Sequence, residues 1–264
     1  TSGPGATNLV TGIADANSDS VAILAITGNV ATALLGRNAF QEVDIVSIVQ
    51  PITKQAWQVK RPEIIPDLVV EALALAAGPR PRPVLIDIPK DVQQQRVGVS
   101  QEIGNEARVC AIETTLATVP GPMRTAELSE CVRLLSQASR PVIYAGGGVM
   151  ASNTGRLLVQ LAEQLNAPIT TTIMGLGAIR PEHPLSFGVL GMHGAHYANV
   201  AVNEADVVLA VGVRFDDRVT GDVDGFIRDG NIIHIDVDKQ ELNKNKAVSL
   251  AIHADLRDAL VQLS

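Results

Sequence analysis

The sequence contains few aromatic residues and only two cysteines. Phe, Trp and Tyr make up 3% of the 264 residues, so aliphatic side chains must fill the interior of a chain that is 46% hydrophobic. An aliphatic interior is typical of parallel strands covered by helices on both faces. Cys110 and Cys131 form neither a CxxC pair nor a metal-finger spacing. We therefore expect two buried, reduced thiols.

An excess of basic charge and a long apolar run are also absent. The formal net charge is −7, from 21 Lys and Arg against 28 Asp and Glu, which argues against binding to nucleic acid or to an anionic membrane surface. No apolar run approaches the roughly 18–20 residues that a membrane-spanning helix needs. The chain opens on Thr1, without Met and without a charged leader, so we expect a cytoplasmic location.

Apolar runs and helical patterns alternate along the first third of the chain. Residues 1–8 (TSGPGATN) are typical of a turn between a strand and a helix, but no strand precedes them, so we expect a piece of a longer polypeptide. Segment 40–49 fits no single pattern. Hydrophobic spacing predicts, in order, a helix at 6–17, a strand at 21–26, a helix at 62–77 and a strand at 84–88.

A stretch without sustained periodicity, 93–123, predicts a linker between two domains, 1–92 and 124–264. The second domain should begin with a helix capped by Thr125, and Ser152 or Asn153 should cap the next helix. Its predicted elements are a helix at 125–137, a strand at 141–145, a helix at 152–166, strands at 168–173, 207–213 and 231–236, and a helix at 255–263. This alternation predicts an α/β fold with two doubly wound parallel-sheet domains.

Two glycine-bounded segments in the second domain point to a ligand site. Residues 212–221 (GVRFDDRVTG) follow the buried strand at 207–213, and open α/β sheets bind ligands beyond the carboxyl ends of their strands. Segment 190–194 (LGMHG) lies about twenty residues earlier. The forked guanidinium groups of Arg214 and Arg218 suit a phosphate or a carboxylate. We therefore expect a negatively charged ligand.

A second signal favours a nucleotide. The glycine turn at 146–148 follows a strand and precedes a helix, where backbone N–H groups approach phosphates. Asp236 closes a later strand, where nucleotide-binding sheets place an acid for ribose hydroxyls. His234 in the same strand is interpreted as a core residue. His193 and His196 lack a third ligand nearby, so no metal site is expected.

Taken together, eight segments resemble the catalytic subunits of the acetohydroxyacid (acetolactate) synthase family, which are thiamine diphosphate enzymes that also carry FAD. FQE, LGMHG and RFDDRVTG are the most specific of them, whereas GPGATN and DIPKD are shared with other thiamine diphosphate enzymes. The segments, in family order, are 1–8 (TSGPGATN), 39–44 (AFQEVD), 52–54 (ITK), 83–91 (PVLIDIPKD), 174–177 (MGLG), 190–194 (LGMHG), 212–221 (GVRFDDRVTG) and 233–238 (IHIDVD).

The resemblance implies that residues 1–92 are the C-terminal part of a pyrimidine-binding domain and that 124–264 are a Rossmann-like central FAD domain. The family's catalytic glutamate would then precede Thr1, and its metal-binding GDG…N motif would follow Ser264. We therefore expect the isolated chain to be inactive. The parent enzyme would use thiamine diphosphate, Mg²⁺ and FAD to decarboxylate pyruvate and transfer the hydroxyethyl group to a second 2-ketoacid, in branched-chain amino-acid biosynthesis. It would be a homodimer or tetramer, with a small regulatory subunit possible.

The resemblance also implies roles for individual residues. Catalytic roles fall on Gln41 near the thiamine, on Lys54, and on Arg218, which would hold the carboxylate of the second ketoacid. Phe40, Met192 and Asp217 would line the substrate channel. The flavin does no net redox chemistry in this family. The positions that match FAD contacts are Arg80, Gly146, Gly147, Gly148, Thr172, Ile173, Leu190, Gly191, Met192, His193, Gly212, Val213, Arg214, Phe215, Asp216, Asp236, Val237 and Asp255.

Two alternatives stay open at this point. A sister carboligase such as glyoxylate carboligase would use a different acceptor, and Arg218 and Gln41 argue against it. A flavin- or nucleotide-binding module without catalysis fits the nucleotide-type sheet, because no general acid–base pair is evident in the sequence. With half of the first domain missing, we also expect an exposed, aggregation-prone sheet edge around 21–26 and 84–88.

Overall fold

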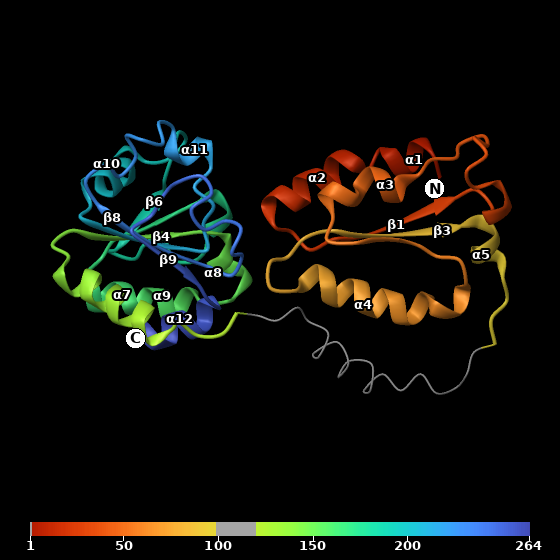
Figure 1. Ribbon diagram of the computed structural model, residues 1–264. Coiled ribbons are helices and arrows are strands. Elements are labelled where there is room, and N and C mark those ends of the chain that lie inside the picture. Colours follow the sequence, from red (N-terminus) through yellow and green to blue (C-terminus); the bar gives the residue numbers. More distant parts are fainter. Residues whose placement is uncertain (1, 99–119) are drawn as a thin grey trace. The chain divides into compact units, whose positions relative to one another are not determined.

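The computed structural model describes residues 2–98 and 120–264, which fall into two compact units (Figure 1). The first unit comprises Thr1–Thr118 and the second Val119–Ser264. Most of the predicted linker, and Cys110 within it, lie outside the described residues. Within residues 2–98 and 120–264, every helix is too short or too polar to span a lipid bilayer.

The first unit contains a three-stranded parallel sheet. Its strands are β1 (Leu24–Asn29), β2 (Ala56–Gln58) and β3 (Val84–Pro89), in the order β1-β3-β2. Ile86 of β3 pairs with Ile26 on one side and with Trp57 on the other. The helices are α1 (Pro4–Thr7), α2 (Val10–Asp19), α3 (Ile45–Val49), α4 (Ile65–Ala77) and α5 (Lys90–Gln94), with 3-10 turns at Thr32–Leu34, Gln50–Ile52 and Pro62–Ile64.

Side chains of β3 alternate between the two faces of this sheet. Ile86 packs with Leu68 of α4, whereas Leu85 packs on the other face with Ile13 of α2 and Ile45 of α3. Figure 1 shows α4 below the sheet and α2 and α3 above it. Because β3 is buried on both faces, it reads in the sequence as a continuous apolar run.

The structure corrects several expectations for the first unit. The single helix predicted at 6–17 is two helices, α1 and α2. The first strand begins at Leu24, because the pairing with β3 starts where Leu24 lies opposite Val84. Segment 84–88 is the central strand, so the prediction of an exposed edge there is wrong. The edge expected at 21–26 falls on β1, an outer strand of this sheet, where the Ile26 side chain is 55% exposed.

The second unit contains a six-stranded sheet whose neighbouring strands are all parallel. The order is β6-β5-β4-β7-β8-β9. The strands are β4 (Pro141–Ala145), β5 (Ile169–Thr171), β6 (Ser186–Val189), β7 (Val207–Val211), β8 (Asn231–Asp236) and β9 (Leu250–His253). The helices are α7 (Thr125–Gln137), α8 (Gly147–Ala151), α9 (Gly155–Leu165), α10 (His196–Glu204), α11 (Asp217–Thr220) and α12 (Leu256–Leu263), with a 3-10 turn at Ile173–Gly175.

Helices cover both faces of this sheet. Residues of α7, α9 and α12 pack on Ile143 and Leu209 on one face, whereas Val202 of α10 packs on Val208 on the other. The strand order reverses between β4 and β7, which is the switch point of a doubly wound, Rossmann-like sheet. The predicted α/β class with parallel sheets is confirmed.

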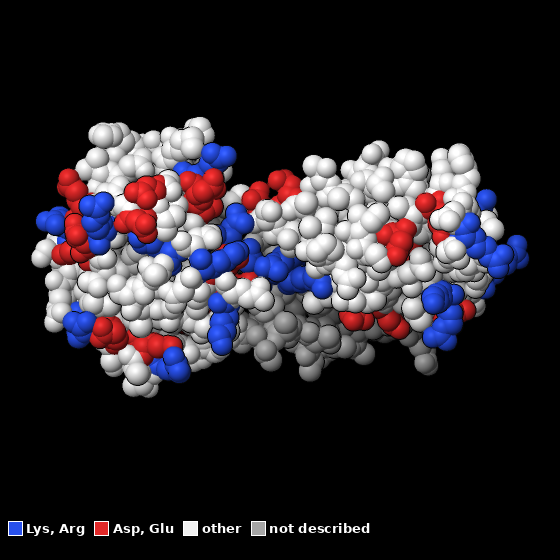
Figure 2. Space-filling view, turned by 45° about the horizontal axis from the view of Figure 1, so that its top comes forward, with Lys and Arg blue, Asp and Glu red and all other residues white. Residues whose placement is uncertain are grey.

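Figure 2 shows acidic and basic side chains side by side at several places on this unit.

The predicted caps of the second unit are wrong. Arg124, not Thr125, is the N-cap of α7, where the Glu127 carboxylate accepts the Arg124 backbone N–H at 2.9 Å. Neither Ser152 nor Asn153 caps the next helix, because both lie in the turn between α8 and α9, which begins after Thr154. The strand expected at 168–173 is shorter, since the chain turns into the 3-10 helix after Thr171.

Candidate functional site

Two glycine turns meet at the switch point of the second sheet. The Gly146 N–H donates to the Val211 carbonyl at 3.0 Å, and the Gly148 N–H donates to the Gly212 carbonyl at 3.2 Å. A Cβ atom on Gly146 would lie 2.0 Å from the Gly212 oxygen, and one on Gly212 would lie 2.6 Å from the Gly148 Cα. Only glycine permits this approach, which joins the loop after β4 to the loop after β7.

The loop after β5 lies beside the first of these turns. The Thr172 N–H donates to the Ala145 carbonyl at 2.9 Å, and the Thr172 hydroxyl accepts the Gly175 N–H at 3.0 Å. A Cβ on Gly147 would lie 3.1 Å from the Met174 Cβ. Ile173 is 65% exposed, although it is a large apolar side chain. Three of the predicted nucleotide-binding segments, 146–148, 172–173 and 212–216, are therefore adjacent at the carboxyl ends of β4, β5 and β7.

The loop after β7 is anchored by Phe215. This residue has a φ of 48°, and its buried ring lies 5.9 Å from the Tyr144 ring and 5.1 Å from the His234 ring. Its neighbours Arg214 and Asp216 are half-buried. The Asp216 carboxylate caps α11 by accepting the Arg218 N–H at 3.0 Å. The aromatic anchor thus fixes the backbone from which both polar side chains project.

His234 of β8 supports the loop after β7 from within the core. Its side chain is fully buried, and Nε2 donates to the Val213 carbonyl at 2.9 Å. Burial lowers the pKa of His234 to about 4, so the imidazole is neutral near pH 7. This placement agrees with the prediction of a core histidine.

Asp236 and Val237 lie at the carboxyl end of β8. The Asp236 side chain is mostly buried and accepts the Asp238 N–H at 2.8 Å. The Val237 carbonyl lies 3.1 Å from His253 Nε2. Asp255 caps α12 by accepting the N–H groups of Arg257 and Asp258. Its carboxylate therefore has a structural partner of its own.

The LGMHG segment packs against the RFDDRVTG segment. The Leu190 N–H donates to the Thr171 carbonyl at 2.9 Å, and the Met192 N–H donates to the Arg218 carbonyl at 2.8 Å. Gly191 between them has a φ of 106°, and a Cβ there would lie 2.7 Å from the Arg218 oxygen. His193 is exposed. Within the residues that the structure describes, no three His, Cys, Asp or Glu side chains could hold a metal ion.

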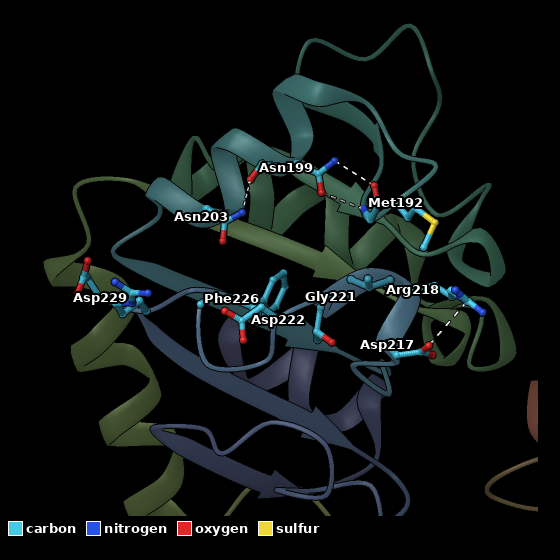
Figure 3. Close-up of a pocket in the computed structure, with 14 residues that line it drawn as sticks. Met192, Asn199, Asn203, Asp217, Arg218, Gly221, Asp222, Phe226 and Asp229 are labelled. Atoms are coloured by element: carbon cyan, nitrogen blue, oxygen red, sulfur yellow. Dashed lines mark hydrogen bonds and ion pairs between the residues drawn. The ribbon is translucent and has the colours of Figure 1, made fainter.

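Met192, Asp217 and Arg218 lie at one end of an open groove of about 810 Å³ (Figure 3). All three side chains are well exposed, and Arg218 Nε lies 3.7 Å from Asp217 Oδ2. A contact of this length between exposed groups is weak. The Arg218 side chain is therefore accessible to an anion.

The rest of this groove was not predicted from the sequence. Its walls include Asn199 and Asn203 of α10 and the loop that carries Asp222 and Phe226. The missed helix, HYANVAVNE, mixes small and polar residues, so its apolar stripe is weak. The spacing of Asn199 and Asn203 at i, i+4 could have indicated a polar helix face, because side chains at this spacing lie on the same side of a helix.

In the first unit the structure brings two predicted segments together. A Cβ on Gly3 would lie 2.6 Å from the Gln41 carbonyl oxygen, so the TSGPG turn packs against the FQE loop. The Glu42 carboxylate accepts the N–H groups of Ala39, at 2.8 Å, and Gly36. Gln41 has a φ of 60°, and Phe40 is 88% exposed. The loop thus presents a large apolar side chain to solvent.

Lys54 and Arg80 make contacts within the first unit. Lys54 Nζ donates to the Leu75 carbonyl at 2.8 Å, near the C-terminus of α4, where a cation is favourable. Arg80 Nε donates to the Ser20 hydroxyl at 3.0 Å. The structure therefore gives both side chains a structural partner besides the roles that the resemblance implies.

A buried carboxylate links the three strands of the first sheet, and sequence analysis missed it. Asp87 accepts hydrogen bonds from Thr27 and Asn29 of β1, both at 2.8 Å, and from Gln58 of β2 at 3.2 Å. Asn29 also donates to the Val43 carbonyl at 3.0 Å. The network therefore connects the central strand to the segment that follows the FQE loop.

The strand order and the glycine turns define the second unit as a doubly wound α/β domain. Comparison with known proteins names the family. Residues 128–263 match the central domain of thiamine pyrophosphate enzymes, and residues 1–48 match their N-terminal TPP-binding domain. The chain belongs to the thiamine pyrophosphate enzyme family.

Curated relatives are similar over nearly the whole chain. A probable acetolactate synthase large subunit of Methanocaldococcus jannaschii is 44% identical over 100% of this chain and 44% of its own length. An acetolactate synthase of Arthrospira platensis is 46% identical over 98% of this chain and 45% of its own. Acetolactate synthase 1, chloroplastic, of Zea mays is 46% identical over 98% and 40%. The chain therefore spans less than half the length of these relatives.

Proposed function

We propose that the chain is part of an acetolactate synthase, which decarboxylates pyruvate and joins the two-carbon unit to a second 2-ketoacid. The relatives at 44–46% identity support this activity for the parent protein. The structural observation that supports the proposal most directly is the 2.8 Å hydrogen bond from the Met192 N–H to the Arg218 carbonyl. This bond brings the LGMHG and RFDDRVTG motifs together at one groove. Thiamine diphosphate, held with Mg²⁺, supplies the carbanion chemistry when bound.

Residues of this chain would bind and orient the reactants. The exposed Arg218 guanidinium suits the carboxylate of the second ketoacid, because its fork matches both oxygens. Met192 and Asp217 flank it at the groove end. In the first unit, Gln41 and the exposed Phe40 lie on the loop held by Glu42. We assign Gln41 to the thiamine centre and Phe40 to the substrate channel. We also propose that the parent assembles as a dimer or tetramer.

The second unit is proposed to bind FAD at the switch point. The proposal is supported by the glycine turn after β4, which lies at the switch point and packs through its backbone against Gly212 of the loop after β7. Thr172, on the loop after β5, and Arg214, on the loop after β7, would hold the pyrophosphate region, and the Asp236 carboxylate ends β8 where ribose hydroxyls are received. The flavin would serve structure rather than net electron transfer.

A chimera tests the carboligase proposal. This chain would replace its counterpart in the Methanocaldococcus jannaschii relative, which supplies the remaining segments of an enzyme. We expect the purified chimera to form acetolactate from pyruvate, and Arg218→Ala to lower kcat/KM at least about a hundredfold, the order expected for loss of a charged contact to a carboxylate. A folded, thiamine-binding chimera that forms no acetolactate would contradict the proposal.

A second function, a flavin-binding module without catalysis, is favoured by one observation. The switch-point site is built within the second unit alone, from loops after β4, β5 and β7. Flavin binding by the isolated chain together with an inactive chimera would support this alternative.

A further inference from the structure

One helix of the second unit holds both walls of the groove through two asparagines. Asn199 and Asn203 lie one turn apart on α10 (Figure 3). The Asn199 side chain accepts the Gly191 N–H and donates to the Gly191 carbonyl, both at 3.1 Å, and it donates to the Ala195 carbonyl at 3.1 Å. Asn203 accepts the Ile227 N–H at 3.2 Å and donates to the Asn199 carbonyl at 3.0 Å.

The Asn199 contacts bear on the most constrained part of the LGMHG loop. Gly191 has a φ of 106°, a conformation that few other residues adopt. The following Met192 N–H donates to the Arg218 carbonyl at 2.8 Å. Asn199 binds both polar backbone groups of Gly191, whose carbonyl also accepts the Gly194 N–H at 2.9 Å, and so it helps to fix the peptide planes on either side of that residue. The direction of the Met192 N–H, and hence the contact with Arg218, follows from this.

An asparagine is required for this pattern. Its amide offers one acceptor and two donors, which match the Gly191 N–H and the carbonyls of Gly191 and Ala195. An aspartate keeps the acceptor but turns an oxygen toward two carbonyl oxygens. An alanine leaves the three backbone groups of a half-buried loop without this partner.

We propose that Asn199 is a positioning residue that sets the Met192 backbone against Arg218 and so orients the anion-binding end of the groove. The part that concerns the ketoacid rests on the proposed function, whereas the positioning of the loop does not. Asn203 performs a different task on the same helix, because it holds Ile227, a β-branched residue with a φ of 49°. It therefore serves as a matched control.

Amide hydrogen exchange of the purified chain tests the positioning directly. We expect Asn199→Ala to speed exchange at Gly191 and Met192 about tenfold, the loss of roughly one hydrogen bond, and to leave the amides of β7 and β8 unchanged. Asn203→Ala should speed exchange at Ile227 and leave Gly191 and Met192 unchanged. Unchanged exchange at Gly191 and Met192 in Asn199→Ala, or equal acceleration in both variants, would overturn the proposal.

Two further measurements keep the test decisive. If Asn199→Ala unfolds, Asn199→Asp preserves the side-chain shape, and we expect it to speed exchange at Met192 in a folded protein; wild-type exchange there would overturn the proposal. In an active chimera, Asn199→Asp should raise KM for the second ketoacid by about tenfold with little change in kcat, the effect of misplacing a binding contact. Because exchange is read without substrate, an inactive chimera bears on the proposed function alone.

Discussion

Gly148 and Gly212 touch through their backbones, since a Cβ on Gly212 would lie 2.6 Å from the Gly148 Cα. This contact joins the carboxyl ends of β4 and β7, the two strands between which the order of the sheet reverses. The switch point at which we propose a flavin site therefore depends on two residues that lack side chains.

Gly212→Ala should destabilise the second unit more than Gly221→Ala. Both glycines have a positive φ, 59° and 54°, but a Cβ on Gly221 would meet no atom within 4 Å. We expect Gly221→Ala to cost about 1–3 kcal/mol from backbone strain alone, since a φ of 54° with a ψ of −112° is a conformation that suits glycine. Gly212→Ala should cost about 1–3 kcal/mol more, because the added methyl overlaps Gly148. Urea unfolding of both variants measures the difference, and equal losses would contradict the contact.

His234 should make stability fall as the pH drops from about 6.5 to 4. Its pKa is lowered to about 4 in the folded chain, from 6.5, so the unfolded chain binds the proton first. The stabilisation is complete above pH 6.5 and lost as the pH falls through 4, and it amounts to roughly 3 kcal/mol. His234→Gln should flatten this part of the curve in urea unfolding at pH 7 and pH 5. If His234→Gln leaves the pH dependence of stability unchanged, the His234 imidazole binds a proton equally well in the folded and unfolded chains.

Lys54→Gln should lower the stability of the first unit by about 0.5–1 kcal/mol, because its ammonium binds the Leu75 carbonyl near the end of α4. Lys60→Gln, at an exposed lysine, is the control and should change little. Thermal unfolding followed by Trp57 fluorescence reads this unit. In an active chimera, a lower kcat in Lys54→Gln, in a protein that remains folded, would favour the catalytic role that the resemblance implies.

Cys131 should be unreactive in the folded chain. Burial raises the pKa of its thiol to about 12, so hardly any thiolate exists at pH 8. In a Cys110→Ser background, which removes the other cysteine, a thiol reagent should label nothing until denaturant is added and one thiol afterwards. Rapid labelling under native conditions would mean that α7 opens readily.

Much of the fold was predictable because apolar runs mark its buried strands. The segments 141–145, 207–213 and 231–236 are flanked by glycine or polar turns, and each contains a strand of the second sheet. The short strands β2, β6 and β9 have only three or four residues, most of them half-buried, which is too few to show a hydrophobic period. The N-cap of α7 was not predictable, because arginine is not a typical N-cap residue. Arg124 occupies this position since its backbone N–H donates to the Glu127 carboxylate.

The candidate site was predictable only in part. Glycine turns after apolar runs located the loops that meet at the switch point. The supporting contacts were not predictable, since Asn199 and Asp87 act on backbone or side chains that only the fold brings near. The same reason explains Lys54, whose partner Leu75 lies 21 residues away in the sequence.

Titration of the purified chain with FAD, followed by flavin fluorescence and with NAD as the control ligand, is the most direct test of a flavin site at the switch point. We expect saturable FAD binding that Arg214→Ala or Asp236→Ala weakens, whereas Arg156→Ala, at an exposed arginine on α9, leaves it unchanged. Absence of FAD binding by a folded chain, or binding that none of these substitutions alters, would contradict a flavin site at the switch point.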